Sequence, residues 1–185
     1  MLGIKLSSRD AIIEAAFQVF NRQPTATLAD VAVHAGVGRA TLHRHFTSRA
    51  NLMVALAHVA MEELSQAVEA STAIATSHGH GLRLALEAVI PLAERQGFLA
   101  QEPVDQDPTI AEALARQKTE TCQAIDAAKV EGVFAKAVPT AWIAEAYDAL
   151  IYAAWATVRS GEATPRQAAD LAWHTLTNGL NEAPK

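Results

Sequence analysis

The sequence predicts an all-α protein, and three observations support this fold class. Half of the 185 residues are hydrophobic, which is enough for a substantial core. Alanine is abundant, β-branched runs are absent, and no strand-like alternation of apolar and polar residues persists. Only 9 glycines and 7 prolines interrupt the chain. We therefore expect an amino-terminal three-helix domain at residues 1–50, followed by an all-helical body at residues 51–185.

The first expected helix runs from about Arg9 to Asn21. Ser7 or Ser8 can cap its start, because a serine hydroxyl accepts a hydrogen bond from the free N–H groups of a first turn. Pro24 prevents the helix from continuing much further. The apolar residues at helical spacing predict its inner face, which comprises Ile12, Ile13, Ala16, Phe17 and Phe20.

The stretch TLADVAVHAGVGRATLHRHF, from Thr27 to Phe46, predicts a helix, a tight turn and a second helix. Thr27 is suited to cap the first helix, and Asp30 places a carboxylate near the positive end of that helix. Gly36 can adopt the left-handed conformation that reverses the chain. Leu42 and Phe46 fall on the inward face of the second helix. This arrangement is typical of a helix-turn-helix, which places its second helix in the major groove of DNA.

The outward face of that second helix is basic. Two arginines and two histidines occur there with little acid nearby, and such side chains neutralise phosphates. An arginine aimed at a base edge can also make a bidentate contact with guanine. The alternative is the solvated face of an ordinary helical hairpin. The candidate DNA-binding residues are Thr27, Gly38, Arg39, Ala40, Thr41, His43, Arg44, His45 and Arg49.

The net charge of −5 does not exclude a nucleic-acid partner, because the charge is unevenly distributed. Residues 1–50 contain six Lys and Arg against three Asp and Glu, a net charge of +3, so the remainder carries −8. A basic end attracts phosphate, whereas an acidic body is repelled by it. The distribution therefore agrees with an amino-terminal DNA-binding domain.

The first quarter of the chain also resembles the DNA-binding domain of the tetracycline-repressor (TetR) family of bacterial transcription regulators. The matching residues are Ala16, Phe17, Phe20, Thr27, Asp30, Val31, Ala32, Ala35, Gly36, Val37, Thr41, Leu42, Arg44, His45, Phe46, Ser48, Arg49 and Leu52. Two positions depart from the family pattern: His43 replaces a tyrosine that usually contacts phosphate, and Ala40 replaces a residue that is often glycine. An imidazole can still donate to a phosphate, with a strength that depends on pH. The resemblance implies a homodimeric, ligand-responsive regulator, most often a repressor.

A long helix is expected to follow Phe46 and to run to about Ser71. Its first turn lies beside the DNA-binding residues, where Arg49 is expected to contact a phosphate, and its far end belongs to the body. A tilt at the body end would therefore move the recognition helix. In a dimer this changes the spacing of two recognition helices that must fit DNA grooves about 34 Å apart, or a multiple of that. His58 and Met61 are expected to face the body and could border a ligand, with core packing as the alternative.

Four further helices are expected in the body, at residues 82–96, 108–130, 139–160 and 164–180. Pro91 should bend the first of them. The two histidines of the preceding SHGHG sequence suggest a metal site. Such a site needs three or four ligands in fixed geometry, and no Cys or carboxylate is adjacent, so we expect a solvated loop and no metal.

The last two expected helices, at 139–160 and 164–180, predict a homodimer interface. From Ala141 to Val158 there is no Lys or Arg, so nearly every side of that helix is apolar and one side needs a cover beyond its own body. In the last helix, one side carries Ala168, Ala172 and Gly179 and another carries Trp173, Leu176 and Leu180. Packed on their symmetry mates, the two helices would form a four-helix interface whose two-fold axis matches a palindromic operator.

Three classes of function were compared. A regulator that an apolar small molecule releases from DNA is the first, with the ligand favouring a state whose DNA-binding domains are badly spaced. The second is a dimeric DNA-binding protein with a dense core and no effector. The third is a helical enzyme, which we exclude because the chain has no nucleophile elbow, His-Glu-x-x-His sequence or phosphate loop, and no cofactor is expected. The candidate ligand-binding residues are His58, Met61, Phe98, Cys122, Trp142, Tyr147 and Trp155.

The sequence further predicts a cytoplasmic protein. Cys122 is the single cysteine, so no internal disulfide can form, as suits a reducing compartment. No signal peptide is visible in the first residues. The longest apolar run contains Glu145 and Asp148, which makes it a poor membrane span.

Overall fold

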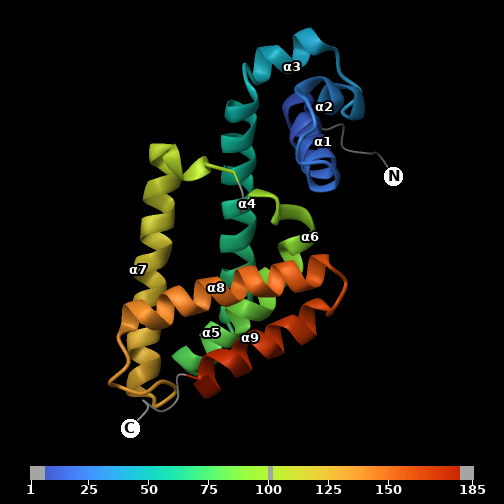
Figure 1. Ribbon diagram of the computed structural model, residues 1–185. Coiled ribbons are helices and arrows are strands. Elements are labelled where there is room, and N and C mark those ends of the chain that lie inside the picture. The colour runs from blue at the N-terminus through green and yellow to red at the C-terminus, as the bar shows by residue number, and fades with distance from the viewer. Residues whose placement is uncertain (1–6, 100–101, 180–185) are drawn as a thin grey trace. The chain divides into compact units, whose positions relative to one another are not determined.

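The computed structural model describes residues 7–99 and 102–179, and every regular element in that part of the chain is helical (Figure 1). The elements are α1 (Ser8–Arg22), α2 (Leu28–His34), α3 (Arg39–His45), α4 (Arg49–Thr72), α5 (His78–Val89), η1 (Ile90–Leu92), α6 (Ala93–Gln96), η3 (Val104–Gln106), α7 (Pro108–Val130), α8 (Thr140–Arg159) and α9 (Pro165–Gly179). This confirms the predicted all-α class. No helix of the described residues is long and apolar enough to span a membrane.

The chain divides into two compact units, and the boundaries between them lie within helices. The first unit contains the chain up to Met61 together with Arg95–Ile110. The second contains Glu62–Glu94 and the chain from Ala111 onward. Helix α4 therefore contributes its first half to one unit and its second half to the other.

The core of the first unit forms around α1, whose predicted inner face is buried. Phe17 and Phe20 are 1% and 0% exposed. Phe98, from the segment after α6, packs against both rings with centroid separations of 6.0 Å. Leu52 and Leu56 of α4 belong to the same cluster, so this unit extends past the expected domain of residues 1–50.

The core of the second unit is built mainly from α5, α8 and α9. Helices α8 and α9 pack along each other, and α9 also contacts α5. Ala168, Ala172 and Leu176 of α9 are buried in this core, so the expectation that they face a dimer partner is corrected. Trp173 packs edge-on to Phe134 at 6.4 Å, and Leu180 lies outside the described residues.

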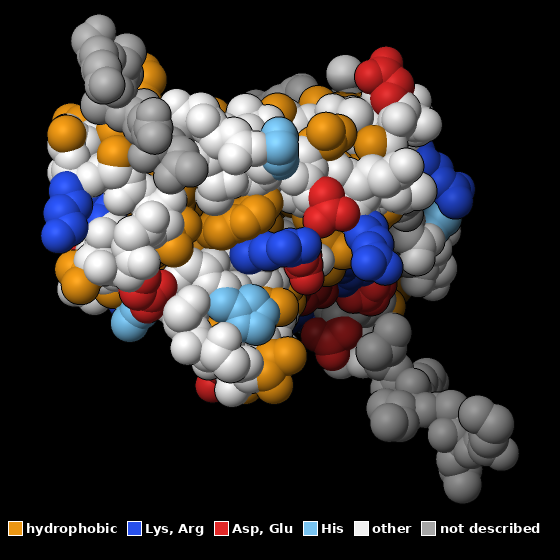
Figure 2. Space-filling view, turned by 90° about the horizontal axis from the view of Figure 1, so that it is seen from below, with side chains coloured by type: hydrophobic (Ala, Val, Ile, Leu, Met, Phe, Trp, Pro, Cys, Tyr) orange, Lys and Arg blue, Asp and Glu red, His pale blue; other side chains and the backbone are white. Residues whose placement is uncertain are grey.

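Ion pairs cover the surface between α5 and α9. Arg83 bonds Asp170 of α9 at 3.1 Å and Glu87 of α5 at 3.0 Å. Figure 2 shows that Lys and Arg lie beside Asp and Glu on the face viewed there, with hydrophobic side chains between them. Such a mixed surface has no charge preference that would attract a polyanion.

Helix α5 begins earlier than predicted, and the SHGHG sequence is its cap and first turn rather than a loop. Ser77 is the N-cap, and the Glu131 carboxylate accepts hydrogen bonds from the backbone N–H groups of His78 and Gly79, at 2.8 and 2.9 Å. A Cβ atom on Gly79 would lie 2.6 Å from the Val133 side chain, so only glycine permits this approach. The helix start is thus stabilised by the end of α7, a tertiary contact that the local sequence does not show.

The predicted breaks elsewhere in the second unit are confirmed. Pro91 interrupts α5, which passes into the 3-10 turn η1 because proline lacks the N–H needed to continue the helix. Helices α7 and α8 end before Gly132 and Gly161, whose φ angles are +84° and +77°.

Candidate nucleic-acid interface and ligand cavity

Helices α2 and α3 form the predicted helix-turn-helix, and both pack against α1. Thr27 and Asp30 form a capping box: the Thr27 hydroxyl accepts from the Asp30 N–H at 3.3 Å, and the Thr27 N–H donates to the Asp30 carboxylate at 2.8 Å. That backbone hydrogen bond, with a second from the Thr27 hydroxyl, lowers the pKa of Asp30. Gly36 follows with φ +65°. The predicted cap and turn are therefore confirmed.

Helix α3 buries one face and exposes the other. Leu42 and the following Phe46 are 1% and 4% exposed, which fixes the helix against the core of the first unit. Thr41 is half-buried. The exposed residues of α3 are Arg39, Ala40, His43, Arg44 and His45. None of the seven residues of α3 is acidic, so its free face carries only basic and neutral groups.

A hollow of about 290 Å³ lies between the beginnings of α2 and α3. Thr27, Arg39 and His43 line it, so three of the predicted DNA-contacting residues meet at one place. Apolar side chains form the rest of its wall, among them Leu28 and Leu42. The hollow joins a basic edge to a short apolar floor, which suits contact with a sugar-phosphate strand.

Gly38 precedes α3 as its N-cap. Its φ of −69° and ψ of 150° are open to any residue, and a Cβ placed on it would meet nothing within 4 Å. Neither backbone strain nor internal packing therefore requires glycine here. The missing side chain leaves space at the exposed end of the helix, where a partner could approach the backbone closely.

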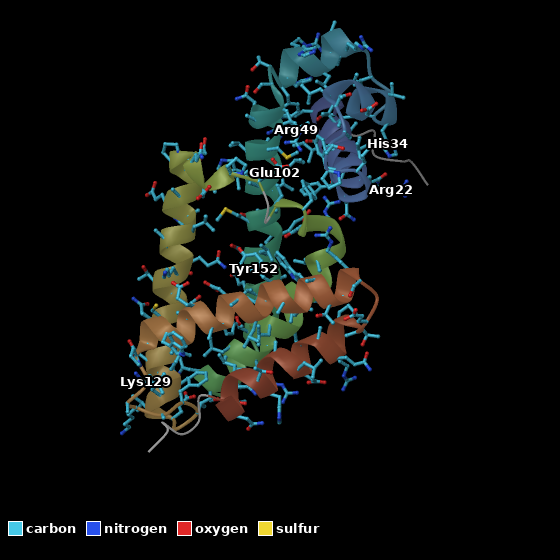
Figure 3. All side chains as sticks on the ribbon, viewed as in Figure 1. Arg22, His34, Arg49, Glu102, Lys129 and Tyr152 are labelled. Atoms are coloured by element: carbon cyan, nitrogen blue, oxygen red, sulfur yellow. The ribbon has the colours of Figure 1, made fainter. Side chains whose placement is uncertain are left out.

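Arg49 is placed differently from our expectation. Its guanidinium donates two hydrogen bonds to the Glu102 carboxylate, at 2.8 and 2.9 Å, and a third to the Pro24 carbonyl oxygen at 2.8 Å (Figure 3). It also lies over the Phe20 ring, 5.0 Å from the centroid. The hydrogen bonds to Glu102 raise the pKa of Arg49. These internal partners give Arg49 a structural role within the first unit, and its contact with phosphate stays a prediction.

The second unit contains a cavity of about 570 Å³ bounded by α4, α5, α7 and α8. Its size falls in the range of small-molecule sites, about 300–1,000 Å³. The apolar part of the wall includes Leu64, Val68, Leu82, Ala85, Val89 and Ile151. A hollow of this size favours a body that binds a small molecule over one that serves only to dimerise.

Tyr147 is the predicted ligand-binding residue that lines this cavity. Its hydroxyl donates to the Leu82 carbonyl oxygen at 2.8 Å, and burial raises the pKa of the phenol. The hydrogen bond fixes the ring against α5 and leaves its apolar edge to contribute to the wall.

The other aromatic candidates lie elsewhere. Phe98 belongs to the core of the first unit. Trp142 is 64% exposed on α8. Trp155 donates its indole N–H to the Val89 carbonyl oxygen at 3.1 Å and packs at the edge of the second core. The sequence shows that these side chains are large and apolar, but it does not show in which direction each ring points.

The remaining three candidates also lie outside the cavity wall. His58 is exposed on α4 and forms a hydrogen bond with the Thr109 hydroxyl at 3.0 Å. Met61 is half-buried at the end of the first unit. Cys122 is half-buried against the core of the second unit, beside cavity-lining residues of α7 rather than among them.

Three carboxylates that the sequence analysis did not select line the cavity. They are Glu69 of α4, Glu120 of α7 and Asp148 of α8, and no Lys or Arg of the described residues joins them. Asp148 is half-buried, and desolvation, followed by the nearby Glu145, raises its pKa. In the sequence, the sign that Asp148 could be functional was an acidic residue in a mostly apolar helix.

Comparison with known proteins gives a family match for the first unit and a relative along the whole chain. Residues 12–56, which include α2 and α3, match the family described as bacterial regulatory proteins, tetR family. The chain is 29% identical over 185 residues to the HTH-type transcriptional repressor LfrR of Mycolicibacterium smegmatis, covering 99% of this chain and 95% of the relative.

Solved structures show the same likeness. A crystal structure of the TetR-like transcriptional regulator LfrR from Mycobacterium smegmatis in complex with proflavine has a TM-score of 0.78 and 28% identity, covering 95% of this chain and 97% of that one. The ketosteroid transcriptional regulator KstR2 of Mycobacterium tuberculosis shares the fold, with a TM-score of 0.77 and 17% identity over 98% of both chains.

Proposed function

Because residues 12–56 match the tetR family of bacterial regulatory proteins, we propose that the chain is a dimeric repressor whose α3 binds a palindromic operator and whose second unit binds an effector. The observation that carries the proposal is the division of α3 into two faces. Leu42 anchors the helix to the core, while the opposite face is exposed, basic and free of acid. A short exposed cationic helix on a fixed support has the shape and charge that the major groove accepts.

The chemistry of the α3 residues assigns them different parts in DNA binding. Arg39 and Arg44 carry permanent charges that neutralise phosphate or bind guanine. His43 and His45 can donate hydrogen bonds, more strongly when protonated. Arg49 holds the start of α4 in place and affects DNA binding through that support.

The cavity supports a small-molecule effector. It is roomy enough for one, and the LfrR structure contains proflavine. We therefore take proflavine as the first probe of this chain. The alternative of a DNA-binding protein without an effector is less favoured, because the second unit has a cavity of the size of a small-molecule site.

Helix α4 offers a route by which occupancy of the cavity reaches the DNA-binding unit. Leu52 and Leu56 of this helix are buried in the first core, and Leu64 and Val68 of the same helix line the cavity. A ligand that prefers one position of α4 shifts the population toward that position, by as much as its affinity for the two positions differs. The DNA affinity falls when that position misplaces α3.

Dimerisation is proposed to involve the exposed side of α8. Trp142 and Tyr152 are 64% and 55% exposed, and alanines lie between and after them on the same side of the helix, at Ala149, Ala153 and Ala156. Leu171 of α9 is 59% exposed and would join the interface. A mostly apolar stripe of this kind is self-complementary around a two-fold axis.

The experiment begins with selection of preferred duplexes from a random DNA library, followed by anisotropy titrations of the parent, Arg44→Ala and Arg159→Ala. Both arginines are exposed near helix ends, but Arg159 lies on α8 in the second unit. We expect Arg44→Ala to lose about tenfold or more in affinity, with Arg159→Ala unchanged. Equal affinities of the three proteins, or no sequence preference in the selection, would overturn the proposal.

A further inference from the structure

The wall of the ligand cavity in the second unit is mainly apolar, and its charged side chains include three acids. Three carboxylates line it, from Glu69, Glu120 and Asp148, against no Lys or Arg of the described chain. A charge in a partly buried hollow is screened less than a charge in open water. The charge of a bound molecule is therefore an important determinant of its affinity.

The three carboxylates have no partner of their own. Within residues 7–99 and 102–179, none of their side chains makes a hydrogen bond or an ion pair. Two other carboxylates of the same unit are paired: Glu131 binds His78, and Asp170 binds Arg83. None of the three forms a direct ion pair, and the charge of Lys118 lowers the pKa of Asp148 by less than burial and Glu145 raise it.

Asp148 is the member of this group with the most to gain from a ligand. It is half-buried, whereas Glu69 and Glu120 are exposed at the cavity edge. Burial and the charge of Glu145 both disfavour its ionised form. An incoming cation would compensate both costs, and an incoming anion would increase them.

The basic groups nearest to this acid are already engaged. Lys118 forms an ion pair with Glu145, with 2.5 Å between Nζ and Oε1. His78, which lines the cavity, has its Nδ1 atom 2.7 Å from the Glu131 carboxylate. Neither is placed to neutralise Asp148 through a direct contact.

From these observations we propose that the effector is a lipophilic cation, with its positive charge beside Asp148 and its apolar body against α4 and α5. This deepens the proposed function and rests on it, because it names the class of molecule that the cavity takes. Glu69 and Glu120 attract the cation at the edge of the cavity. Fatty acids and other apolar anions are excluded by the same charges.

The test uses two probes of nearly equal shape and opposite charge, tetraphenylphosphonium and tetraphenylborate. Binding to the DNA-free, full-length protein is measured by isothermal titration calorimetry and by the shift in unfolding temperature. We expect the cation to bind at least about tenfold more tightly than the anion. Equal affinities, or tighter binding of the anion, would overturn the proposal.

Two variants locate the charge. Asp148→Asn should weaken cation binding about tenfold and strengthen anion binding, whereas Glu112→Gln on the exposed side of α7 should change neither. The unfolding temperature without ligand shows whether each variant is folded, and Asp148→Glu should restore part of the cation affinity. An Asp148→Asn protein that is folded and binds both probes as the parent does would contradict the assignment.

The same experiments distinguish a failure of cation selectivity from a failure of the proposed regulation. If tetraphenylphosphonium binds but leaves operator affinity unchanged, the cavity is cation-selective and the proposed regulation fails. If an uncharged apolar molecule releases DNA while the parent and Asp148→Asn bind the two probes alike, the regulator stands and its cation selectivity is refuted.

Discussion

The pair formed by Arg49 and Glu102 allows a direct test of how the first unit is held together. The structure gives Arg49 two hydrogen bonds to this carboxylate, one to Pro24 and a position over Phe20. A phosphate contact would instead require the guanidinium to face DNA. The two roles make opposite predictions for stability and for the salt dependence of DNA binding.

The magnitude follows from exposure and geometry. The Arg49 and Glu102 side chains are 38% and 17% exposed, so solvent screens the pair in part. Bidentate, charge-assisted hydrogen bonds in such a setting contribute about 1 kcal/mol, and the contact with Phe20 adds about 0.5 kcal/mol. We expect Arg49→Ala to lower the free energy of unfolding by about 2 kcal/mol and Glu102→Gln by about 1 kcal/mol.

Urea unfolding followed by circular dichroism measures both changes, and the double variant gives the coupling between the two residues. We expect a coupling energy of about 1 kcal/mol and an unchanged salt slope for DNA binding by Arg49→Ala. If Arg49 instead contacts one phosphate, its removal should lower the slope of log K against log salt by about 0.9 with no loss of stability. That result, with no coupling to Glu102, would refute the structural role.

Three further predictions follow from the backbone, the α5–α7 contact and α8. Gly36→Ala should destabilise the protein by about 1 kcal/mol, because φ is +65° there. Gly38→Ala should leave the urea midpoint unchanged and weaken DNA binding, because a Cβ atom there meets nothing within the chain. Both roles would be contradicted if Gly38→Ala were the destabilising substitution and Gly36→Ala were not. Hydrogen bonds from the α5 backbone lower the pKa of Glu131 from 4.5 to about 2, so its ionised form stabilises the fold above pH 4.5 and that contribution is lost as the pH falls toward 2. Urea midpoints from pH 3 to 7 should therefore vary less with pH in Glu131→Gln, and identical profiles for variant and parent would count against this. Tyr152→Glu should give monomers in size-exclusion chromatography with light scattering, while Leu114→Glu on α7 should remain dimeric, and a dimeric Tyr152→Glu would exclude this face of α8.

The parts of the fold that local chemistry determines could be predicted from the sequence. The capping box of Thr27 and Asp30 lies within four residues, and the left-handed turn at Gly36 depends on one residue. Pro91 ends a helix wherever it occurs in one. The inner face of α1 follows from the spacing of its own apolar residues. Each of these features needs only neighbours in sequence.

The features that were missed depend on residues distant in sequence. The start of α5 needs Glu131, which lies 53 residues beyond His78. The role of Arg49 depends on Glu102, also 53 residues away. The side chains that line the cavity come from four helices, and periodicity alone could not determine which side of each helix faces inward.

The candidate DNA-binding face was more accessible to prediction than the ligand site for the same reason. A single seven-residue helix carries most of the former, and burial of Leu42 fixes its orientation. The cavity was predicted to lie among the body helices, yet of the seven residues proposed for it only Tyr147 is in its wall. Large apolar side chains were chosen as candidates because such residues tend to be buried. The acidic Asp148 in a mostly apolar helix was a better indication of where the ligand site lies.

We propose that DNA binding by the first unit and ligand binding by the second are linked. The most direct measurement is a pair of titrations: operator affinity at several proflavine concentrations, and proflavine affinity with and without saturating operator. We expect each ligand to weaken the binding of the other by the same factor, as thermodynamic linkage requires. Full binding of both at once, with neither affinity changed, would contradict it.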